Sequence, residues 1–100
     1  MVVDINKDNF EKEVLNSKGI VIVDFYGTWC MPCKMLAPTV HKVCEDKNYK
    51  LAKVDIDENE DLVRQFHIMS VPTLKIFKDG KEINSSVGVV SETQLLNLIG

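Results

Sequence analysis

The chain contains the stretch Ile20-Val21-Ile22-Val23-Asp24-Phe25-Tyr26-Gly27-Thr28-Trp29-Cys30-Met31-Pro32-Cys33. Its first half is apolar and mostly β-branched, which predicts a buried strand that Gly27-Thr28 ends. After Pro32, apolar residues recur at three- and four-residue spacing, which predicts a helix with one buried face. The residues on that face are Cys33, Leu36, Val40, Val43 and Cys44. The stretch therefore predicts a strand, a short loop and a helix, with two cysteines at the junction.

The spacing of Cys30 and Cys33 suits a reversible couple between a dithiol and a disulfide. Pro32 fits the first turn of the helix, where a missing N–H costs nothing. Cys30 is then expected at the helix N-terminus, beside unpaired backbone N–H groups and the positive end of the helix dipole. Both favour a thiolate, so Cys30 is predicted to be the reactive thiol.

Two other interpretations of the cysteine pair are inert structural thiols and half of a zinc site. A zinc site needs about four ligands, and the other candidates are Cys44, His41 and His67, with no second Cys-x-x-Cys. Cys44 follows Cys33 by eleven residues, which is roughly 16 Å along a helix. A disulfide needs Cα atoms within about 7 Å. Redox chemistry is therefore favoured, and Cys44 is interpreted as a core residue.

Composition restricts the class of protein. One hundred residues predict a single domain over residues 1–100. A net charge of −3 without a basic cluster argues against nucleic-acid binding. No apolar run has the length of a signal peptide core or a membrane span, so we expect a cytoplasmic monomer without membrane contact. Three cysteines are too few and too close for a disulfide-stapled secreted scaffold.

The remaining patterns alternate between strands and helices. Strands are predicted at residues 2–5, 20–26, 49–55, 73–77 and 82–87, and helices at 6–19, 32–46, 59–66 and 91–99. Asn6 and Asn59 are expected to cap helices, and Ser91 with Gln94 to form a capping box. Asp79-Gly80 predicts a two-residue hairpin turn. The order βαβαβαββα predicts an α/β fold in which a parallel sheet gains an antiparallel edge and helices cover both faces.

Several short motifs occur in a characteristic order along the chain. They are Val23-Asp24-Phe25, Trp29-Cys30-x-Pro32-Cys33-Lys34, Ala37-Pro38, Ala52-Lys53-x-Asp55-x-Asp57, Val71-Pro72-Thr73, Phe77-x-x-Gly80 and Val87-Gly88. With them the chain resembles the thioredoxin family over nearly its whole length. The resemblance implies the thioredoxin fold, a central five-stranded mixed sheet flanked by four helices, with a cis peptide before Pro72. It also implies reduction of protein disulfides with electrons from a thioredoxin reductase, and neither a metal nor an organic cofactor.

The chain departs from the family pattern at two positions. Met31 stands where the family usually has glycine, which affects the expected redox potential and range of partners. Tyr26 replaces a common tryptophan, which is expected to affect packing and fluorescence. Met31, Pro32 and Lys53 are therefore the residues expected to tune the redox couple, Lys53 because the resemblance places it near Asp24. The alternative for Lys53 is an ordinary strand-end lysine.

Asp24 is a charged residue within a run that predicts a buried strand. A solvated strand position is the alternative, but parallel strands are covered on both faces. A buried carboxyl is costly to ionise, so its pKa is expected to be raised. Such a group close to Cys33 could accept its proton, directly or through a water molecule, and the resemblance implies this role.

An apolar rim for substrate is expected around Trp29, Met31, Ile56 and Val71. Scattered surface apolar residues are the alternative. The resemblance places Pro72 opposite the dithiol, where it offers no N–H and no metal-ligating group, and Gly88 leaves room for substrate. The exposed backbone of Val71 could then pair with an extended substrate strand. Met35 and Met69 are interpreted as packing residues, and His41 and His67 as solvent-facing.

The predicted function is a thiol–disulfide oxidoreductase that reduces protein disulfides and maintains redox homeostasis, with Cys30, Cys33 and Asp24 as catalytic residues. Cys30 attacks the substrate disulfide, and Cys33 then resolves the mixed disulfide. Two rival classes are a binding module whose dithiol is idle, and a thiol oxidase or isomerase of an oxidising compartment. Loss of function on Cys30→Ser would argue against the first, and a signal peptide in the unprocessed gene product would favour the second.

Overall fold

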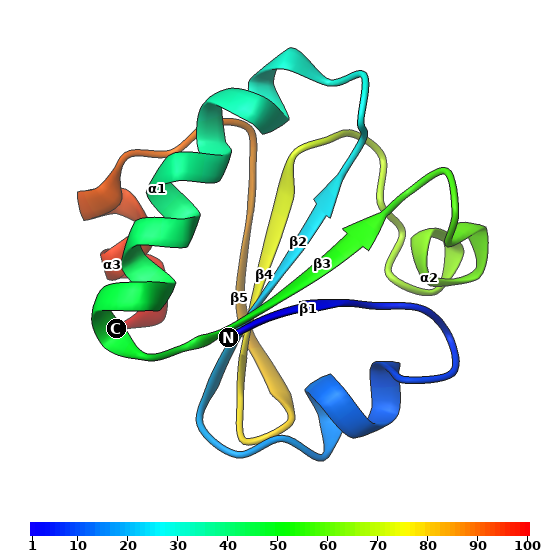
Figure 1. Ribbon diagram of the computed structural model, residues 1–100, viewed down its shortest axis with the longest axis horizontal. Coiled ribbons are helices and arrows are strands. Elements are labelled where there is room, and N and C mark those ends of the chain that lie inside the picture. Colours follow the sequence, from blue (N-terminus) through cyan, green and yellow to red (C-terminus); the bar gives the residue numbers. More distant parts are fainter.

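A five-stranded sheet forms the centre of the computed structural model, which describes residues 1–100 (Figure 1). The strands are β1 (Val2–Asp4), β2 (Ile20–Tyr26), β3 (Lys50–Asp55), β4 (Thr73–Lys78) and β5 (Lys81–Val87). The helices are η1 (Glu11–Leu15), α1 (Met31–Lys47), α2 (Glu60–Gln65) and α3 (Glu92–Ile99). The predicted order of elements is confirmed.

The sheet is mixed, with strand order β1-β3-β2-β4-β5. β1 and β2 both pair parallel with β3, whereas β4 pairs antiparallel with β2 and with β5. Parallel neighbours need a crossover connection, and α1 supplies it between β2 and β3. The predicted antiparallel edge is therefore the β4–β5 hairpin, whose turn residues Asp79 and Gly80 both have positive φ as a two-residue turn of this kind requires.

The sheet separates two hydrophobic cores, one on each face. η1 and α2 cover the first core, which contains Phe10, Val14, Phe25 and Leu62 among its buried residues. α1 and α3 cover the second, which contains Ile22, Leu36, Val40, Leu74 and Leu95. Figure 1 shows the two pairs of helices on opposite sides of the strands. The four helices and mixed sheet of the thioredoxin fold are confirmed.

The face predicted for the long helix is also confirmed. α1 buries the same five residues that the spacing singles out, Cys33, Leu36, Val40, Val43 and Cys44. Cys44 is free and packs in the second core, where burial raises the pKa of its thiol to about 11. At the other end of the chain, Ser91 and Gln94 form the predicted capping box of α3.

The first helix differs from its prediction. η1 is a five-residue π-helix rather than a long α-helix, and the N–H of Asn16 reaches back to the carbonyl of Glu11. Asn6 does cap the preceding turn, because its side chain accepts the N–H groups of Asp8 and Asn9. Gly19 lies beyond the helix end, and its N–H donates to the Asp79 carboxylate at 2.7 Å. Gly19 therefore joins the hairpin turn instead of capping the helix.

The cap expected at Asn59 is wrong as well. Asn59 occupies the position before α2, but its side chain accepts no hydrogen bond from the helix. Its amide instead donates to the carbonyl of Asp55 at 2.9 Å. This bond ties the start of α2 to the end of β3, next to the strand ends where the cysteine pair lies.

Candidate active site

Cys30 and Cys33 form a disulfide across the first turn of α1, with Cα atoms 5.3 Å apart. Cys30 is the N-cap residue with extended backbone, and Pro32 lies in the first turn as predicted. The N–H of Cys33 donates to Sγ of Cys30 at 3.2 Å. An N-cap side chain commonly accepts such an N–H, and here the acceptor is sulfur. The helix N-terminus is thus aimed at one sulfur of the pair.

Burial does not distinguish the two cysteines. Cys30 is 4% exposed and Cys33 is 6% exposed, so the predicted attacking thiol is as buried as the resolving one. Their surroundings do differ. Sγ of Cys30 lies 3.8 Å from the carbonyl oxygen of Val71, whereas Cys33 lines a separate cavity that is open to solvent.

That cavity has a volume of about 260 Å³ and contains Asp24 as well as Cys33. Asp24 is 5% exposed, and its Oδ1 has no hydrogen-bond partner. Burial raises the pKa of the Asp24 carboxyl from 3.8 to about 6, and the positive charge of Lys53 limits the rise. Cys33 and Asp24 therefore line the same cavity, which is open to solvent. The expected buried carboxyl is therefore present beside Cys33.

Lys53 lies beside Asp24, as the family resemblance implies. The two residues are Cα partners in the β2–β3 ladder, and Lys53 lines the same cavity. The Lys53 ammonium lies 4.6 Å from the centre of the Tyr26 ring. The sequence predicts that Tyr26, on β2, affects packing and fluorescence, but it does not predict this contact with Lys53.

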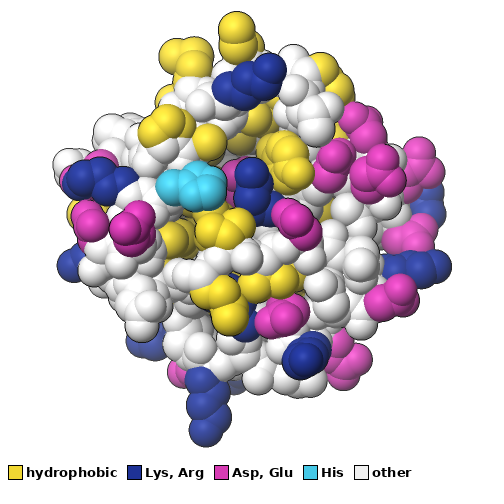
Figure 2. Space-filling view, in the orientation of Figure 1, with side chains coloured by type: hydrophobic (Ala, Val, Ile, Leu, Met, Phe, Trp, Pro, Cys, Tyr) yellow, Lys and Arg dark blue, Asp and Glu magenta, His cyan; other side chains and the backbone are white.

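An apolar groove of about 340 Å³ lies on the other side of the disulfide. It brings together three residues expected in the substrate rim, Trp29, Ile56 and Val71, and adds Val63, Ile68, Met69 and Ser70. Met31 is exposed but does not line the groove. Met35 and Met69 are 66% and 94% exposed, so interpreting them as packing residues is wrong. Figure 2 shows hydrophobic side chains gathered at the end of the molecule where α1 begins.

Pro72 and Gly88 meet behind the Val71 carbonyl. The Val71–Pro72 peptide bond is cis, as the resemblance implies. Pro72 is buried, and its carbonyl accepts the N–H of Gly88 at 2.8 Å. Gly88 has a φ of 93° and open space where a side chain would begin. The loop before β4 and the end of β5 therefore lie together beside the cysteine pair.

Two residues that hold Trp29 were missed by sequence reasoning. The indole N–H donates to the Asp57 carboxylate at 2.8 Å, and the ring lies against Gly27, where an added Cβ would be 2.7 Å from Cε2. Trp29 is 63% exposed, so these two contacts orient a ring that solvent would otherwise leave free. Asp57 is the last residue of the motif Ala52-Lys53-x-Asp55-x-Asp57, which was the one sequence feature that could have indicated its role.

Gly27→Ala is expected to displace the Trp29 indole, because the new methyl group would overlap the ring. The hydrogen bond to Asp57 should then break. Trp29 is the only tryptophan, so its fluorescence spectrum and acrylamide quenching report the displacement directly. Asp57→Asn keeps an acceptor oxygen and is the matched control, with a smaller change expected. An unchanged spectrum in Gly27→Ala would contradict this account.

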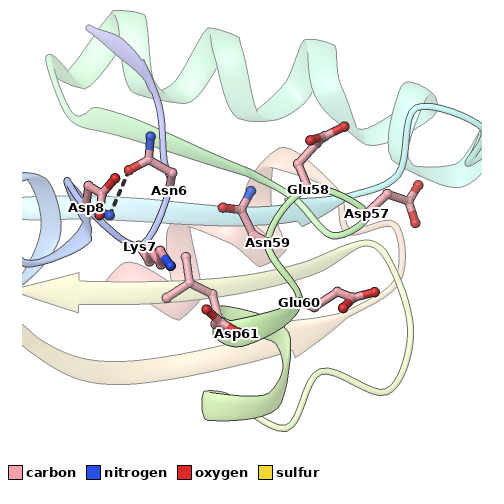
Figure 3. A pocket seen from close by; sticks show the side chains of 9 residues that line it. Asn6, Lys7, Asp8, Asp57, Glu58, Asn59, Glu60 and Asp61 are labelled. Atoms are coloured by element: carbon pink, nitrogen blue, oxygen red, sulfur yellow. Dashed lines mark hydrogen bonds between the residues drawn. The ribbon is translucent and has the colours of Figure 1, made fainter.

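A larger cavity, of about 390 Å³, lies apart from the cysteines (Figure 3). Its lining is polar and mostly acidic, and comes from the segment after β1 and from residues 57–62. No cysteine lines this cavity. In the chain as a whole, no group of His, Cys, Asp or Glu residues is arranged to hold a metal ion. None of the helices has the length and hydrophobicity that crossing a membrane requires.

Comparisons with known proteins agree with this geometry. The thioredoxin family model matches residues 1–100. A thioredoxin of Pseudomonas aeruginosa is 41% identical over 96 residues, covering 94% of this chain and 89% of the relative. Thioredoxin 1 of Synechococcus elongatus is 44% identical over 92 residues, covering 90% and 86%. A thioredoxin of Chlamydia muridarum is 41% identical over 100 residues, covering 99% and 96%.

A paired dithiol at a helix N-terminus on this sheet defines a thiol–disulfide oxidoreductase. The class is that of enzymes that exchange disulfides with protein substrates. The chain belongs to the thioredoxin family. Family membership implies disulfide-bearing substrates, a reductase as partner and catalysis without a cofactor.

Proposed function

We propose that this protein is a general reductant of protein disulfides, acting through the Cys30/Cys33 dithiol and maintaining redox homeostasis. The observation that carries the proposal is the position of the disulfide, with an apolar groove on one side of it and a cavity lined by a buried acid on the other. An idle binding module would need neither the cavity nor the unpartnered carboxyl, since an unpaired buried carboxylate costs stability.

In the proposed reaction, the Cys30 thiolate attacks one sulfur of the substrate disulfide. A Cys30–substrate disulfide forms, and the second substrate sulfur leaves as a thiolate. The Cys33 thiolate then attacks Sγ of Cys30, which re-forms the Cys30–Cys33 disulfide and releases the second substrate thiol. Two electrons pass to the substrate. The N–H of Cys33 directed at Sγ of Cys30 stabilises negative charge on the attacking sulfur.

Asp24 is proposed as the base that takes the proton of Cys33. Its carboxyl has a pKa of about 6, close to the range in which a general base works best near neutral pH. Lys53 is proposed to tune the redox couple through its charge, which acts on the Asp24 carboxyl. Pro32 is proposed to tune it because proline has no N–H, so that the Cys33 N–H is the donor directed at Sγ of Cys30.

The substrate is proposed to bind over Trp29, Ile56, Val71, Pro72 and Gly88. Val71 offers its carbonyl 3.8 Å from the reactive sulfur, and an extended substrate segment can pair with backbone exposed in this way. Trp29 and Ile56 line the apolar groove that would take a side chain next to the substrate cysteine.

The finer cellular assignments belong to the same proposal. Residues 1–100 act as one domain and as a monomer in the cytoplasm. The electron donor is a thioredoxin reductase, and neither a metal, an organic cofactor, a nucleic acid nor a membrane takes part.

The test is reduction of insulin disulfides, with NADPH and a thioredoxin reductase in one arm and dithiothreitol in the other. Activity in both arms is expected. Activity with dithiothreitol alone would refute the proposed donor, and activity in neither arm would refute the proposed reaction. Cys30→Ser is the matched inactive control.

Met31 was expected to tune the potential because glycine permits backbone conformations that a side chain restricts. Met31 begins α1 and does not have positive φ, so backbone strain gives little support to such tuning. We propose that its exposed side chain contacts substrate. Met31→Gly, equilibrated with glutathione, should shift the reduction potential by less than about 10 mV, where roughly 30 mV equals 1.4 kcal/mol. The KM for insulin should rise instead. A lower potential in Met31→Gly would show instead that Met31 tunes the redox couple.

A further inference from the structure

Tyr26, Asp24 and Lys53 lie together on one face of the sheet. Asp24 and Lys53 are Cα partners on neighbouring parallel strands, and Tyr26 follows Asp24 by two residues, so its side chain points to the same face. All three line the 260 Å³ cavity with Cys33. The ring of Tyr26 is thus within the surroundings of the proposed base, although it contacts no reacting atom.

The Lys53 ammonium has a ring and two carboxylates as neighbours in the sheet, because Asp24 on β2 and Asp4 on β1 are both Cα partners of Lys53. It contacts the ring alone. It lies over the Tyr26 ring, 4.6 Å from the centre, which is within the range of a cation–π contact. It forms no ion pair with Asp24, since none of the ion pairs of the protein includes either residue. Asp24 Oδ1 is left without any partner. A flexible lysine beside a buried carboxylate would ordinarily move to neutralise it.

We propose that Tyr26 is a positioning residue whose ring holds the Lys53 ammonium short of an ion pair with Asp24. The inference rests on the proposed role of Asp24 as the base for Cys33. An opposite charge in direct contact lowers a carboxyl pKa by about 1–3 units. The ring therefore preserves a carboxyl basic enough to take a proton, while the charge of Lys53 still acts at longer range.

The other charged and titratable groups form no ion pair that replaces this arrangement. From β1, Asp4 is the Cα partner of Lys53 but forms no ion pair with it. From α1, Cys33 and Lys34 line the cavity, and Cys44 interacts weakly with the charge of Asp24. From β4, the partner of Asp24 is Leu74, which has no charge.

The Tyr26 ring also keeps its own hydroxyl proton. Burial raises the pKa of that hydroxyl, and the charges of Asp55, Asp4 and Asp24 raise it further. The ring therefore stays neutral and attractive to a cation.

The test is titration of the Asp24 carboxyl by carbon-13 NMR in Tyr26→Leu, Tyr26→Met and Tyr26→Phe. The leucine and methionine variants release Lys53 and should lower the pKa of Asp24 by about one unit. The phenylalanine variant keeps the ring and should match the wild type. The pH profile of single-turnover disulfide reduction should shift to lower pH by the same amount in the first two variants alone.

A second background separates positioning from simple hydration of the cavity. In Lys53→Met, the added Tyr26→Leu or Tyr26→Met change should leave the pKa of Asp24 nearly where Lys53→Met puts it. An equal fall in both backgrounds would overturn the inference, because water alone would then account for it. If the Tyr26→Leu and Tyr26→Met variants that keep Lys53 show an unchanged or raised pKa of Asp24, the inference is overturned too.

One measurement needs no variant. The side-chain methylene protons of Lys53 should resonate upfield in the wild type, because they lie over an aromatic ring. Ordinary shifts would overturn the inference even if every leucine or methionine variant failed to fold. None of these NMR readouts requires turnover, so a protein that fails to reduce insulin but shows these shifts would refute the proposed function and not the contact.

Discussion

Cys33→Ser is expected to accumulate covalent complexes with its substrates, whereas Cys30→Ser should form none. In Cys33→Ser the attacking thiol and the backbone N–H that supports it both remain, because that N–H belongs to the main chain of residue 33. The mixed disulfide then forms but cannot be resolved. In Cys30→Ser the remaining thiol faces the Asp24 cavity rather than the Val71 carbonyl.

Pull-down from a lysate followed by non-reducing gels measures the difference. Both variants should also contain Cys44→Ser, which removes the buried third thiol as a source of adducts. The Cys30→Ser/Cys33→Ser double variant sets the background. Equal trapping by the two single variants would contradict the division of roles. Since the two cysteines are equally buried, such a result would mean that the helix terminus does not select the nucleophile.

Asp24→Asn is expected to stabilise the protein and slow it. The carboxyl has a folded-state pKa of about 6 against an ordinary value of 3.8, so its ionisation opposes folding. The penalty is absent below pH 3.8, grows between the two values and is complete above about pH 6. Two pKa units correspond to about 3 kcal/mol. Asp24→Asn should therefore be more stable than wild type by about 2–3 kcal/mol at pH 8 and by roughly half of that at pH 5.

Urea unfolding midpoints at the two pH values measure the stability, and single-turnover disulfide reduction measures the rate. Without a base for Cys33, the resolving step should slow on the order of a hundredfold, the low end of what general-base catalysis contributes. The first step should be unaffected, because Cys30 keeps its helix terminus. A variant less stable at pH 8 would show that Asp24 is a structural partner, and an unchanged rate would show that it is not the base.

Much of this fold was predictable because its signals are local. The apolar run of β2, the spacing of buried residues on α1, the Asp79-Gly80 turn and the Ser91–Gln94 capping box each depend on a few neighbouring residues. The cysteine pair at the start of α1 follows from the same local pattern. The predicted burial of Asp24 followed from its place in a strand covered on both faces.

The features that escaped prediction depend on contacts between distant segments. Trp29 is held by Asp57, twenty-eight residues away, and Lys53 lies over a ring on another strand. η1 has only five residues, which is too short a segment for the spacing of its apolar residues to distinguish a π-helix from an α-helix. Met69 lies exposed in the loop before β4, and its apolar character alone suggested packing. The burial of Cys30 depends on the loop before β4, whose Val71 carbonyl lies 3.8 Å from Sγ of Cys30.

The link between Gly19 and the hairpin turn bears on where this protein can be altered. Gly19 and Asp79 exchange two hydrogen bonds, and Gly80 lies so close to the Leu15 carbonyl that any side chain there would collide with it. Exposed turns are the usual places for inserting an affinity tag or opening a permuted chain. Here an insertion at Asp79-Gly80 would break the two hydrogen bonds that join Gly19, just before β2, to the turn between β4 and β5. The C-terminus, where α3 ends at the surface, is the better attachment point for a label.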